Sequence, residues 1–315
     1  MRVDSVCVLG GGGFVGGHLV ARLSAAGKRV TVLSRHPQRH RELLVLPGVK
    51  LERADIHDRA QLAAHFATAD AVVNLVGILN ESGHDGEGFR RAHVELAHKV
   101  VDACRQQGVK RLLHMSALHA DERNGPSQYL RSKGEAENHV HSFVGNNGLG
   151  VTSFRPSVIF GPGDSFFNRF AGLLKLTVVM PLACAEARFQ PVYVGDVVDA
   201  FAAALVDPAS IGKRIDLCGP EVFTLRGIVE YTAEILGVRR LIVPLPDRLA
   251  RLQATVMEYL PGKPFSLDNY HSLQVDSECG EGCTPCSTGI RAVVPGYLGA
   301  GRSQARLQEL RQRGL

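Results

Sequence analysis

The feature that most constrains the fold of this chain is a run of glycines near its N-terminus. A β-branched, apolar segment, Val6–Leu9, precedes four glycines, and from Phe14 onward the apolar residues recur at helical spacing. Gly10, Gly13 and Gly16 stand three residues apart, as in turns where the backbone closely approaches a pyrophosphate and a helix begins against the strand. The order strand, turn, helix therefore predicts a nucleotide-binding loop rather than a bare turn, with the first helical amides facing phosphates.

The residues after the second predicted strand, Val30–Leu33, bear on which cofactor is bound. An acidic residue usually holds the ribose 2′-hydroxyl at this point, but here Ser34 and Arg35 follow the strand. A guanidinium pairs with a phosphate through two hydrogen bonds, so Arg35 favours a 2′-phosphate and hence NADP(H) over NAD(H). The alternative is that Arg35, Arg39 and Arg41 form a solvated basic loop.

Two further apolar segments predict a parallel sheet. Val49–Ala54 leads into Asp55, and Ala71–Val76 leads into Gly77, so both polar ends belong at the carboxyl edge of the sheet, where ligands bind. Asp55 is suited to accept a hydrogen bond from an adenine amino group, and Gly77 lets a cofactor lie against the strand end. With a long helix over 89–107, the alternation predicts an α/β fold, a Rossmann-type doubly wound parallel sheet.

The candidate chemistry begins at Ser116, directly after the predicted strand Arg111–Met115. Tyr129 and Lys133 follow, four residues apart, which places a phenol and an ammonium on one face of a helix. An ammonium beside a phenol favours the phenolate and brings its pKa down from about 10, as a general acid/base needs. Ser116 is then placed to hydrogen-bond the same substrate oxygen. The alternative is an ordinary surface pair, and we expect His114 to be a satisfied interior side chain.

Composition excludes several classes of protein. The 315 residues are 45% hydrophobic, which is ample for a packed core. The net charge of +5 comes without tryptophan or a dense basic block, so we expect no nucleic-acid partner. The first strand begins almost at residue 1, and the longest apolar stretch, 170–185, is interrupted by Lys175 and Pro181. We therefore expect a cytoplasmic protein without a signal peptide or a membrane span.

The second half predicts a smaller, mostly helical region. We expect residues 1–160 to form the NADP-binding core and 161–315 a mixed substrate or partner region, with 192–218 returning to the core. An apolar stripe over 166–174 has helical spacing. It is interpreted as core, with a hydrophobic pocket over the nicotinamide as the alternative.

The segment Pro246–Leu260 predicts an amphipathic helix that caps the small domain or faces a partner. Arg248 and Arg251 are expected to point outward. A basic helix is predicted over Arg302–Arg313, solvated by default, with anionic lipid head groups as the alternative neighbour. The residues of the segment Pro246–Leu260 that we expect to face inward are Leu249, Leu252, Val256, Met257 and Leu260.

The seven cysteines fall into two groups. The scattered ones are expected to be small core residues of a reduced protein. Cys279, Cys283 and Cys286 form a C-x3-C-x2-C spacing that resembles the cluster-binding loop of radical SAM enzymes, which would hold iron–sulfur or zinc. Such a loop should follow the first strand of a barrel, so we predict no metal site and interpret the segment as an exposed thiol-bearing loop. The scattered cysteines are Cys7, Cys104, Cys184 and Cys218.

Taken together, these motifs resemble the extended and atypical short-chain dehydrogenase/reductases. The motifs are Gly10-x-x-Gly13-x-x-Gly16, the trio Ser116, Tyr129 and Lys133, Arg155–Gly163 and Val192–Val197. The C-terminal part is similar to the stand-alone bacterial relatives of the NADPH-binding accessory subunit of respiratory complex I, through Pro261–Tyr270, Leu273–Val275 and Val293–Leu298. The resemblance implies an NADP(H)-holding Rossmann domain, and in complex-bound members a cofactor held structurally rather than turned over.

Two hypotheses about function follow. The first is an NADP(H)-dependent oxidoreductase or epimerase-like enzyme with a hydrophobic or quinone-like substrate. The second is a non-catalytic assembly or stability factor that holds NADPH and docks on a respiratory membrane complex, peripherally at the inner membrane. The oligomeric state stays open. The catalytic trio is Ser116, Tyr129 and Lys133, and the predicted cofactor contacts are Gly10, Gly13, Phe14, Val15, Gly16, Ser34, Arg35, Asp55, Ile56, Val76, Gly77, Tyr129, Lys133, Pro156 and Val158.

Overall fold

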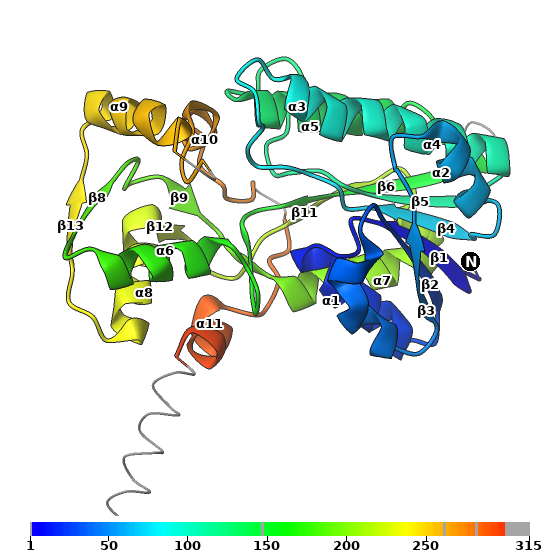
Figure 1. Ribbon diagram of the computed structural model, residues 1–315, viewed down its shortest axis with the longest axis horizontal. Helices are drawn as coiled ribbons and strands as arrows, with labels where there is room; N and C mark the ends of the chain where they lie inside the picture. Colours follow the sequence, from blue (N-terminus) through cyan, green and yellow to red (C-terminus); the bar gives the residue numbers. More distant parts are fainter. Residues whose placement is uncertain (1, 146–147, 261–262, 281–282, 300–315) are drawn as a thin grey trace, which may run out of the picture. The chain divides into compact units, whose positions relative to one another are not determined.

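A computed structural model describes residues 2–145, 148–260, 263–280 and 283–299 (Figure 1). The chain divides into two compact units. The first comprises Met1–Pro156 and Gly195–Leu217, and the second comprises Ser157–Val194 and Cys218–Leu315. The chain therefore leaves the first unit after Pro156 and returns to it for one helix and one strand.

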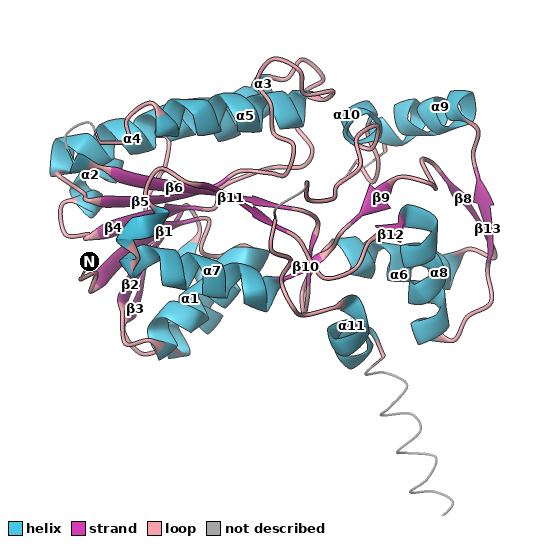
Figure 2. Ribbon diagram, turned by 180° about the vertical axis from the view of Figure 1, so that it is seen from behind, coloured by secondary structure: helices cyan, strands magenta, loops and turns pink. Residues whose placement is uncertain are grey.

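The first unit is a seven-stranded parallel sheet in the order β11-β6-β5-β4-β1-β2-β3, which confirms the predicted doubly wound fold. Helices α2, α4 and α5 cover one face, and α1 and α7 cover the other (Figures 1 and 2). Strand order reverses direction between β1 and β4, so the carboxyl ends of these two strands form the switch point where ligands bind in such sheets. The elements are β1 (Ser5–Leu9), α1 (Phe14–Ala25), β2 (Arg29–Ser34), β3 (Val49–Arg53), α2 (Arg59–Phe66), β4 (Ala71–Asn74), α3 (Glu87–Phe89), α4 (Leu96–Gln107), β5 (Arg111–Met115), α5 (Gln128–His141), β6 (Gly150–Pro156), α7 (Val194–Val206) and β11 (Arg214–Leu217).

Burial follows the position of each strand in this sheet. Every residue of β4 and of β5 is buried, as expected for central strands covered on both faces. In the edge strand β3 only Val49 is buried. The core between the sheet and α2, α4 and α5 is built from aliphatic side chains such as Leu62 and Val100, together with Phe66.

A buried arginine ties the returning segment to the sheet. Arg111 in β5 has no exposed surface, and its guanidinium donates to Ala204 O and Gly150 O and to the hydroxyls of Thr152 and Ser210 at 2.6–3.2 Å. Burial lowers the pKa of Arg111 to about 10. The guanidinium of Arg111 is therefore well paired, and it binds α7 and the residues after it to the sheet.

The second unit is built from short strand pairs packed against helices. Its core includes Phe167 and Leu174 of α6, and Phe166, Phe170 and Leu173 pack against that core. The apolar stripe over 166–174 is therefore core. The parallel pairs are β10–β7 and β13–β8, and the antiparallel pair is β12–β9. The elements are β7 (Ile159–Phe160), α6 (Phe166–Leu176), β8 (Val179–Leu182), β9 (Arg188–Phe189), β10 (Val192–Tyr193), β12 (Phe223–Thr224), α8 (Leu225–Leu236), β13 (Leu241–Pro244), α9 (Asp247–Glu258), α10 (Leu267–Ser272) and α11 (Ile290–Leu298).

The predicted orientation of α9 is wrong. The helix packs through Ala250 and Ala254, which are buried in a small core with Ala183 and Tyr270. The large apolar residues expected to face inward lie on the opposite side and are exposed, and only Met257 among them is half-buried. Helical spacing defines an apolar arc, but the two alanines that allow close packing lie outside that arc. The exposed residues are Leu249, Leu252, Val256 and Leu260.

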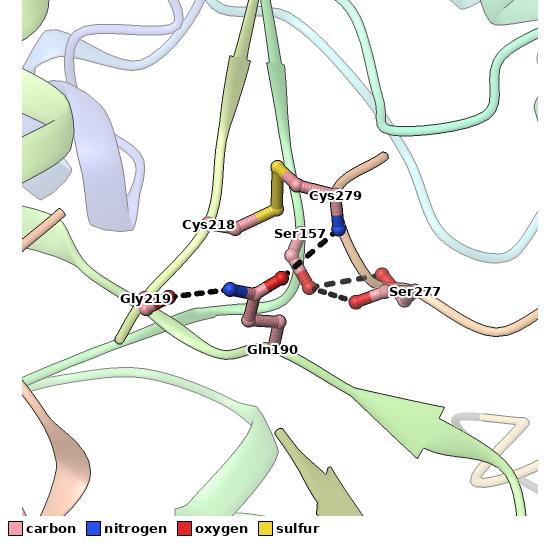
Figure 3. Close-up of a disulfide and its surroundings, with 6 residues drawn as sticks. All are labelled: Ser157, Gln190, Cys218, Gly219, Ser277 and Cys279. Carbon is pink, nitrogen blue, oxygen red and sulfur yellow. Dashed lines mark hydrogen bonds between the residues drawn. A yellow bond between two sulfur atoms is a disulfide. The ribbon is translucent and has the colours of Figure 1, made fainter. Parts of the chain in front are cut away.

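The expectations of a reduced core thiol at Cys218 and of a free loop thiol at Cys279 are also wrong, because these two residues form a disulfide (Figure 3). The two residues are 61 apart in sequence with a Cα–Cα distance of 6.1 Å, which is ordinary for a disulfide. Around it, Cys279 N donates to Gln190 Oε1 at 3.0 Å, and Gln190 Nε2 donates to Gly219 O at 2.8 Å. Nearby, Ser157 Oγ donates to Ser277 O at 2.7 Å.

The disulfide therefore holds the segment that begins at Cys279 against the residues with which the chain re-enters the second unit. Cys286 N also donates to Cys218 O, at 2.7 Å. Among the described residues, no group of three or more His, Cys, Asp or Glu side chains is arranged to hold a metal ion. Cys7 and Cys104 are buried as expected, and Cys184 is half-buried.

None of the helices in the described ranges is long and apolar enough to cross a bilayer. The basic helix predicted over Arg302–Arg313 lies outside the described residues.

Candidate nucleotide-binding and catalytic site

Each glycine of the N-terminal loop meets a different steric demand. Gly10 has φ +78°, and a Cβ there would lie 3.2 Å from the backbone of Leu75 and Val76. Gly13 donates its N–H to Gly10 O at 3.0 Å and caps α1. A Cβ on Gly16 would lie 2.1 Å from Gly10 O. The loop therefore turns through a left-handed residue, passes along the end of β4 and lets α1 begin against β1.

The N-terminus of α1 presents bare backbone. Its cap, Gly13, has no side chain to accept a hydrogen bond, and its first turn, which starts at Phe14 and Val15, contains no acidic residue. The His40 ring packs over the loop, since a Cβ on Gly12 would lie 2.5 Å from it. The first amides of a helix carry partial positive charge and suit phosphate oxygens.

Cations gather at the ends of β2 and β3. Arg35 is exposed directly after β2. His57, beyond β3, has its pKa lowered first by burial and then by the positive charges of Lys99, Arg91 and Arg35, with the Asp55 carboxylate acting in the opposite direction. Three cations thus act on one imidazole, so the potential at this corner of the sheet is positive.

The residues after β3 form a compact turn. Asp55 Oδ1 accepts from His57 N at 3.0 Å, and Asp55 N donates to Gln61 Oε1 at 2.9 Å. Ile56 is half-buried against the core of the first unit. His57 Nδ1 is buried without a hydrogen-bond partner, which is unusual for a polar atom and typical of a position that meets a ligand. At the end of β2, Ser34 Oγ accepts from His36 N at 3.1 Å.

Lys133 is almost completely buried, with 3% of its surface exposed. From α5, its ammonium donates to Met115 O at 3.0 Å and to Val76 O at 3.4 Å. Burial lowers the pKa of Lys133 to about 8, with Glu137 opposing the shift. A Cβ on Gly77 would lie 2.9 Å from Nζ of Lys133. The missing side chain at Gly77 therefore makes room for the amine at the carboxyl ends of β4 and β5.

Ser116 follows β5 at the same edge of the sheet. Its backbone N–H donates to Phe154 O at 2.8 Å, and the residue is 2% exposed. Its hydroxyl oxygen is buried and has no hydrogen-bond partner. Because buried hydroxyls are almost always paired, this oxygen is a candidate for contact with a ligand. The neighbouring residue, Met115, provides the carbonyl that accepts from Lys133.

A buried histidine, absent from the predicted set, supports helix α5. His93 lies in a π-helical segment, Arg90–Glu95, before α4. Its Nε2 accepts from Ile78 N at 3.1 Å, and its Nδ1 lies 2.8 Å from Ser132 Oγ, which donates to Tyr129 O at 2.9 Å. Burial lowers the pKa of His93 to about 2, so the ring is neutral and Nδ1 carries the proton.

The Tyr129 ring packs edge-on against the ring of His93 in this segment and against that of Phe89, the last residue of α3. Its centroid lies 5.7 Å from that of His93 and 6.2 Å from that of Phe89. Turns of π-helix are frequent at functional sites. Sequence reasoning missed this one because a π-helical turn is defined by its hydrogen bonds, which helical periodicity does not reveal.

His114 is interior as predicted, but it is not fully satisfied. Its Nδ1 lies 3.4 Å from Asn74 Nδ2, while Nε2 has no partner. Burial, followed by the charge of Lys133, lowers the pKa of His114 to about 3. Asn74 in turn accepts from Val76 N at 3.2 Å.

The structure thus brings together most of the predicted residues at the carboxyl edge of the first unit. Pro156 ends that unit and its carbonyl accepts from Leu118 N at 3.0 Å. Val158 belongs to the second unit, where its carbonyl accepts from Val192 N.

The chain is similar to known proteins over most of the first unit. A family model described as "NAD dependent epimerase/dehydratase family" matches residues 6–218. This chain belongs to that family. A solved structure, UDP-glucose 4-epimerase of Thermus thermophilus in complex with NAD, superposes with a TM-score of 0.66 at 25% identity, covering 84% of this chain and 98% of that one.

The curated proteins similar to this chain include NADH dehydrogenase subunits and reductases. Subunit 9 of the NADH dehydrogenase (ubiquinone) 1 alpha subcomplex is 31% identical in Arabidopsis thaliana, over 85% of this chain and 67% of the relative. In the mouse protein of that name, identity is 30% and the chain spans 62% of the relative's length. Ceramide reductase of Caulobacter vibrioides is 26% identical over 77% of this chain and 74% of the enzyme.

Proposed function

We propose that this epimerase/dehydratase family member is an NADP(H)-dependent oxidoreductase, with Tyr129 as general acid/base, Lys133 as its electrostatic support and Ser116 as the group that positions the substrate. The observation that carries the proposal is the buried hydroxyl of Ser116, which has no partner, one residue away from the carbonyl that holds Lys133. Such an arrangement is costly in a folded protein unless a ligand completes it.

The residues of the first unit fit a dinucleotide. The uncapped amides that begin α1 suit the pyrophosphate, and Gly10 has the left-handed turn that brings them close. Gly77 leaves space beside Lys133 for the nicotinamide ribose. When bound, a nicotinamide supplies the capacity to donate or accept a hydride.

The protein's own groups handle the proton. The ammonium of Lys133, one helical turn after Tyr129, favours the phenolate of that tyrosine and lets the phenol give or take a proton at its oxygen near neutral pH. Neutral His93 holds Ser132, and Ser132 binds the Tyr129 carbonyl. This chain of bonds fixes the N-terminal turn of α5 without adding a second titrating group.

Arg35 supports a preference for the 2′-phosphate. It is exposed at the end of β2, and it contributes with Lys99 and Arg91 to the positive potential around His57. The test is to titrate the wild type and an Arg35→Asp variant with NADPH and NADH. We expect Arg35→Asp to weaken NADPH binding about 10- to 100-fold, as loss of a charge-assisted hydrogen bond would, and to leave NADH binding equal or tighter. The exposed Arg39→Asp serves as the matched control.

Turnover tests the assignment of Tyr129. NADPH oxidation should be screened with quinone-like, sterol-like and sugar carbonyl compounds, and with ceramide-like lipids because of the Caulobacter relative's name. With an active substrate, Tyr129→Phe should lower kcat by about 10²- to 10⁴-fold and weaken NADPH binding by a much smaller factor. Tyr259→Phe, an exposed phenol in the second unit, should change neither. Equal kcat for the wild type and Tyr129→Phe would refute the assignment.

The names of the complex I relatives favour a second candidate. In it, the chain holds NADPH without turnover and the cofactor stabilises the fold for docking on a respiratory complex. Saturating NADPH would then raise the thermal midpoint of the wild type and of Tyr129→Phe equally, and no substrate of the screen would be consumed.

A further inference from the structure

The strongest unexplained feature of the molecule is the outward face of α9. Leu249, Leu252 and Val256 are 48%, 57% and 56% exposed, and Tyr259, just after the helix, is 76% exposed. The spacing i, i+3, i+7 places the first three on one stripe, opposite the buried Ala250. A helix that packs through alanine and presents leucine and valine to solvent is inverted relative to a surface helix of a globular protein.

The strand pair before α9 also exposes apolar side chains. In β8 and β13, Met180, Leu182 and Ile242 belong to or pack against the core of the second unit. The alternate positions Val179 and Leu241 face outward and are 49% and 61% exposed. They stand opposite each other in the parallel register. The outer face of this pair is therefore apolar as well, although a solvated sheet face normally carries polar residues.

Helix α9 contacts the strand pair directly. Gln253 Nε2 of α9 donates to Pro181 O of β8 at 3.2 Å, and Leu245 N, between β13 and α9, donates to Leu182 O at 3.0 Å. We call the exposed apolar side chains of α9 and of this strand pair together the outer apolar surface; exposed apolar side chains that gather on neighbouring elements mark interaction sites. It consists of Val179, Leu241, Leu249, Leu252, Val256, Tyr259 and Leu260.

The charges around the outer apolar surface indicate what covers it. Both carboxylates of α9 are occupied by internal partners, since Asp247 accepts from the Tyr270 hydroxyl and Glu258 from Leu267 N. Arg248 and Arg251 are exposed on the same helix. The segments 175–182 and 239–260 carry five cationic residues against these two carboxylates. The five are Lys175, Arg239, Arg240, Arg248 and Arg251.

We propose that the outer apolar surface docks on an anionic lipid bilayer, with α9 lying in the plane of the interface. Leucine and valine would enter the acyl boundary, Tyr259 would lie at head-group level, and the arginines would meet lipid phosphates. The inference stands on the second unit alone and does not depend on turnover or on cofactor binding by the first.

The test is co-sedimentation of the full chain with vesicles of phosphatidylcholine, with and without 30% phosphatidylglycerol. We expect binding to the anionic vesicles that weakens with salt. Arg248→Gln with Arg251→Gln should weaken it about thirtyfold, since each cation near an anionic surface contributes about fivefold. Leu252→Glu with Val256→Glu should weaken it at least about tenfold. Val45→Glu, at an 82% exposed apolar residue of the first unit, is the matched control and should bind as the wild type does.

The absence of tryptophan from the chain permits a direct measurement of depth. The lone indole of a Leu252→Trp variant should shift its emission to the blue on anionic vesicles and be quenched by lipids brominated in the acyl chains. The indole of Val45→Trp should show neither effect. Far-ultraviolet circular dichroism and the thermal midpoint establish that each variant is folded.

Several results would overturn the proposal. One is failure of the folded wild type to bind anionic vesicles, and another is binding that leaves the indole of Leu252→Trp unquenched. Binding lost when the tail arginines 302, 306, 311 and 313 become Gln, but kept by Leu252→Glu with Val256→Glu, would assign the lipid contact to the tail. Wild-type dimers that the same double variant turns into monomers, without vesicle binding, would identify the surface as an interface between copies.

Discussion

Helices α5 and α9 depart from the usual arrangement of side chains in opposite directions. α5, in the first unit, buries Lys133, Glu137 and Ser132, whereas α9, in the second unit, buries alanine and exposes leucine and valine. Burying a charge costs free energy unless it is paired, and exposing large apolar side chains forgoes burial that would stabilise the fold. Each helix therefore carries a local cost that packing alone does not explain.

The difference indicates two kinds of site. In α5 the buried polar groups are held by specific partners, as Arg155 holds Glu137 through three hydrogen bonds at 2.7–2.9 Å. Such a network fixes one geometry, as chemistry requires. In α9 the exposed side chains are not held in one geometry by specific partners. An apolar face with cations at its margin suits the surface of a lipid bilayer. Substitutions on the two helices should therefore differ sharply in their effect on stability.

The largest contrast is expected between Glu137→Gln and Leu252→Gln. Glu137 is fully buried and also lies 3.7 Å from Arg214, so removing its charge leaves two guanidiniums without their anion and should cost about 3–5 kcal/mol. Leu252 is 57% exposed, and its replacement should change the free energy of unfolding by less than about 0.5 kcal/mol. Urea unfolding of both variants measures the two values, and equal losses would remove the contrast between the helices.

The second unit should instead depend on its covalent link. Cys218→Ser removes the cross-link between two positions that are 61 residues apart in sequence. It should lower the free energy of unfolding by about 2–4 kcal/mol under oxidising conditions. Adding dithiothreitol to the wild type should produce the same loss. The control is Cys184→Ser, at a half-buried cysteine outside the disulfide, and we expect it to respond little. A wild type insensitive to the reductant would argue against the bridge.

Lys133 allows the cost of the buried charge in α5 to be measured. Its pKa is lowered by burial from 10.5 to about 8, so between these pH values the unfolded chain binds more protons than the folded one. The free energy of unfolding should therefore rise with pH across that window, by about 3 kcal/mol in total relative to Lys133→Met. Chemical unfolding of both proteins at pH 7.5, 9 and 10.5 tests this, and parallel pH profiles would show that the amine is not buried as described.

Features set by local spacing were predictable from sequence. The strand Arg111–Met115 was predicted with the boundaries that the structure has, and the strands Val6–Leu9 and Val30–Leu33 were predicted to within one residue at each end. Their periods are visible within a few residues, and the glycine loop and the pair Tyr129 and Lys133 depend on equally short spacing.

Features set by distant partners were not predictable. The hydrogen-bond partners of Arg111 lie 39 to 99 residues away in sequence, and the disulfide partner of Cys218 lies 61 residues away. The tautomer of His93 depends on Ile78 and Ser132, which belong to separate segments. For α9, the sequence showed the apolar face of the helix but not the elements that it packs against. Periodicity ranks the faces of a helix by hydrophobicity, and it does not show that two alanines let the helix pack closely against its neighbours.

The same dependence on surroundings can be tested within a single helix, α1. A Cβ on Gly17 would have nothing within 4 Å, whereas one on Gly16 would lie 2.1 Å from Gly10 O. Gly17→Ala should therefore stabilise the protein by about 0.5–1 kcal/mol, because alanine loses less backbone entropy in a helix. Gly16→Ala should destabilise it by roughly 1–3 kcal/mol through overpacking. Thermal unfolding of the two variants measures this difference. Equal shifts of the two midpoints would mean that position in the helix governs the effect. The contrast between α5 and α9 instead requires that the surroundings of each residue govern it.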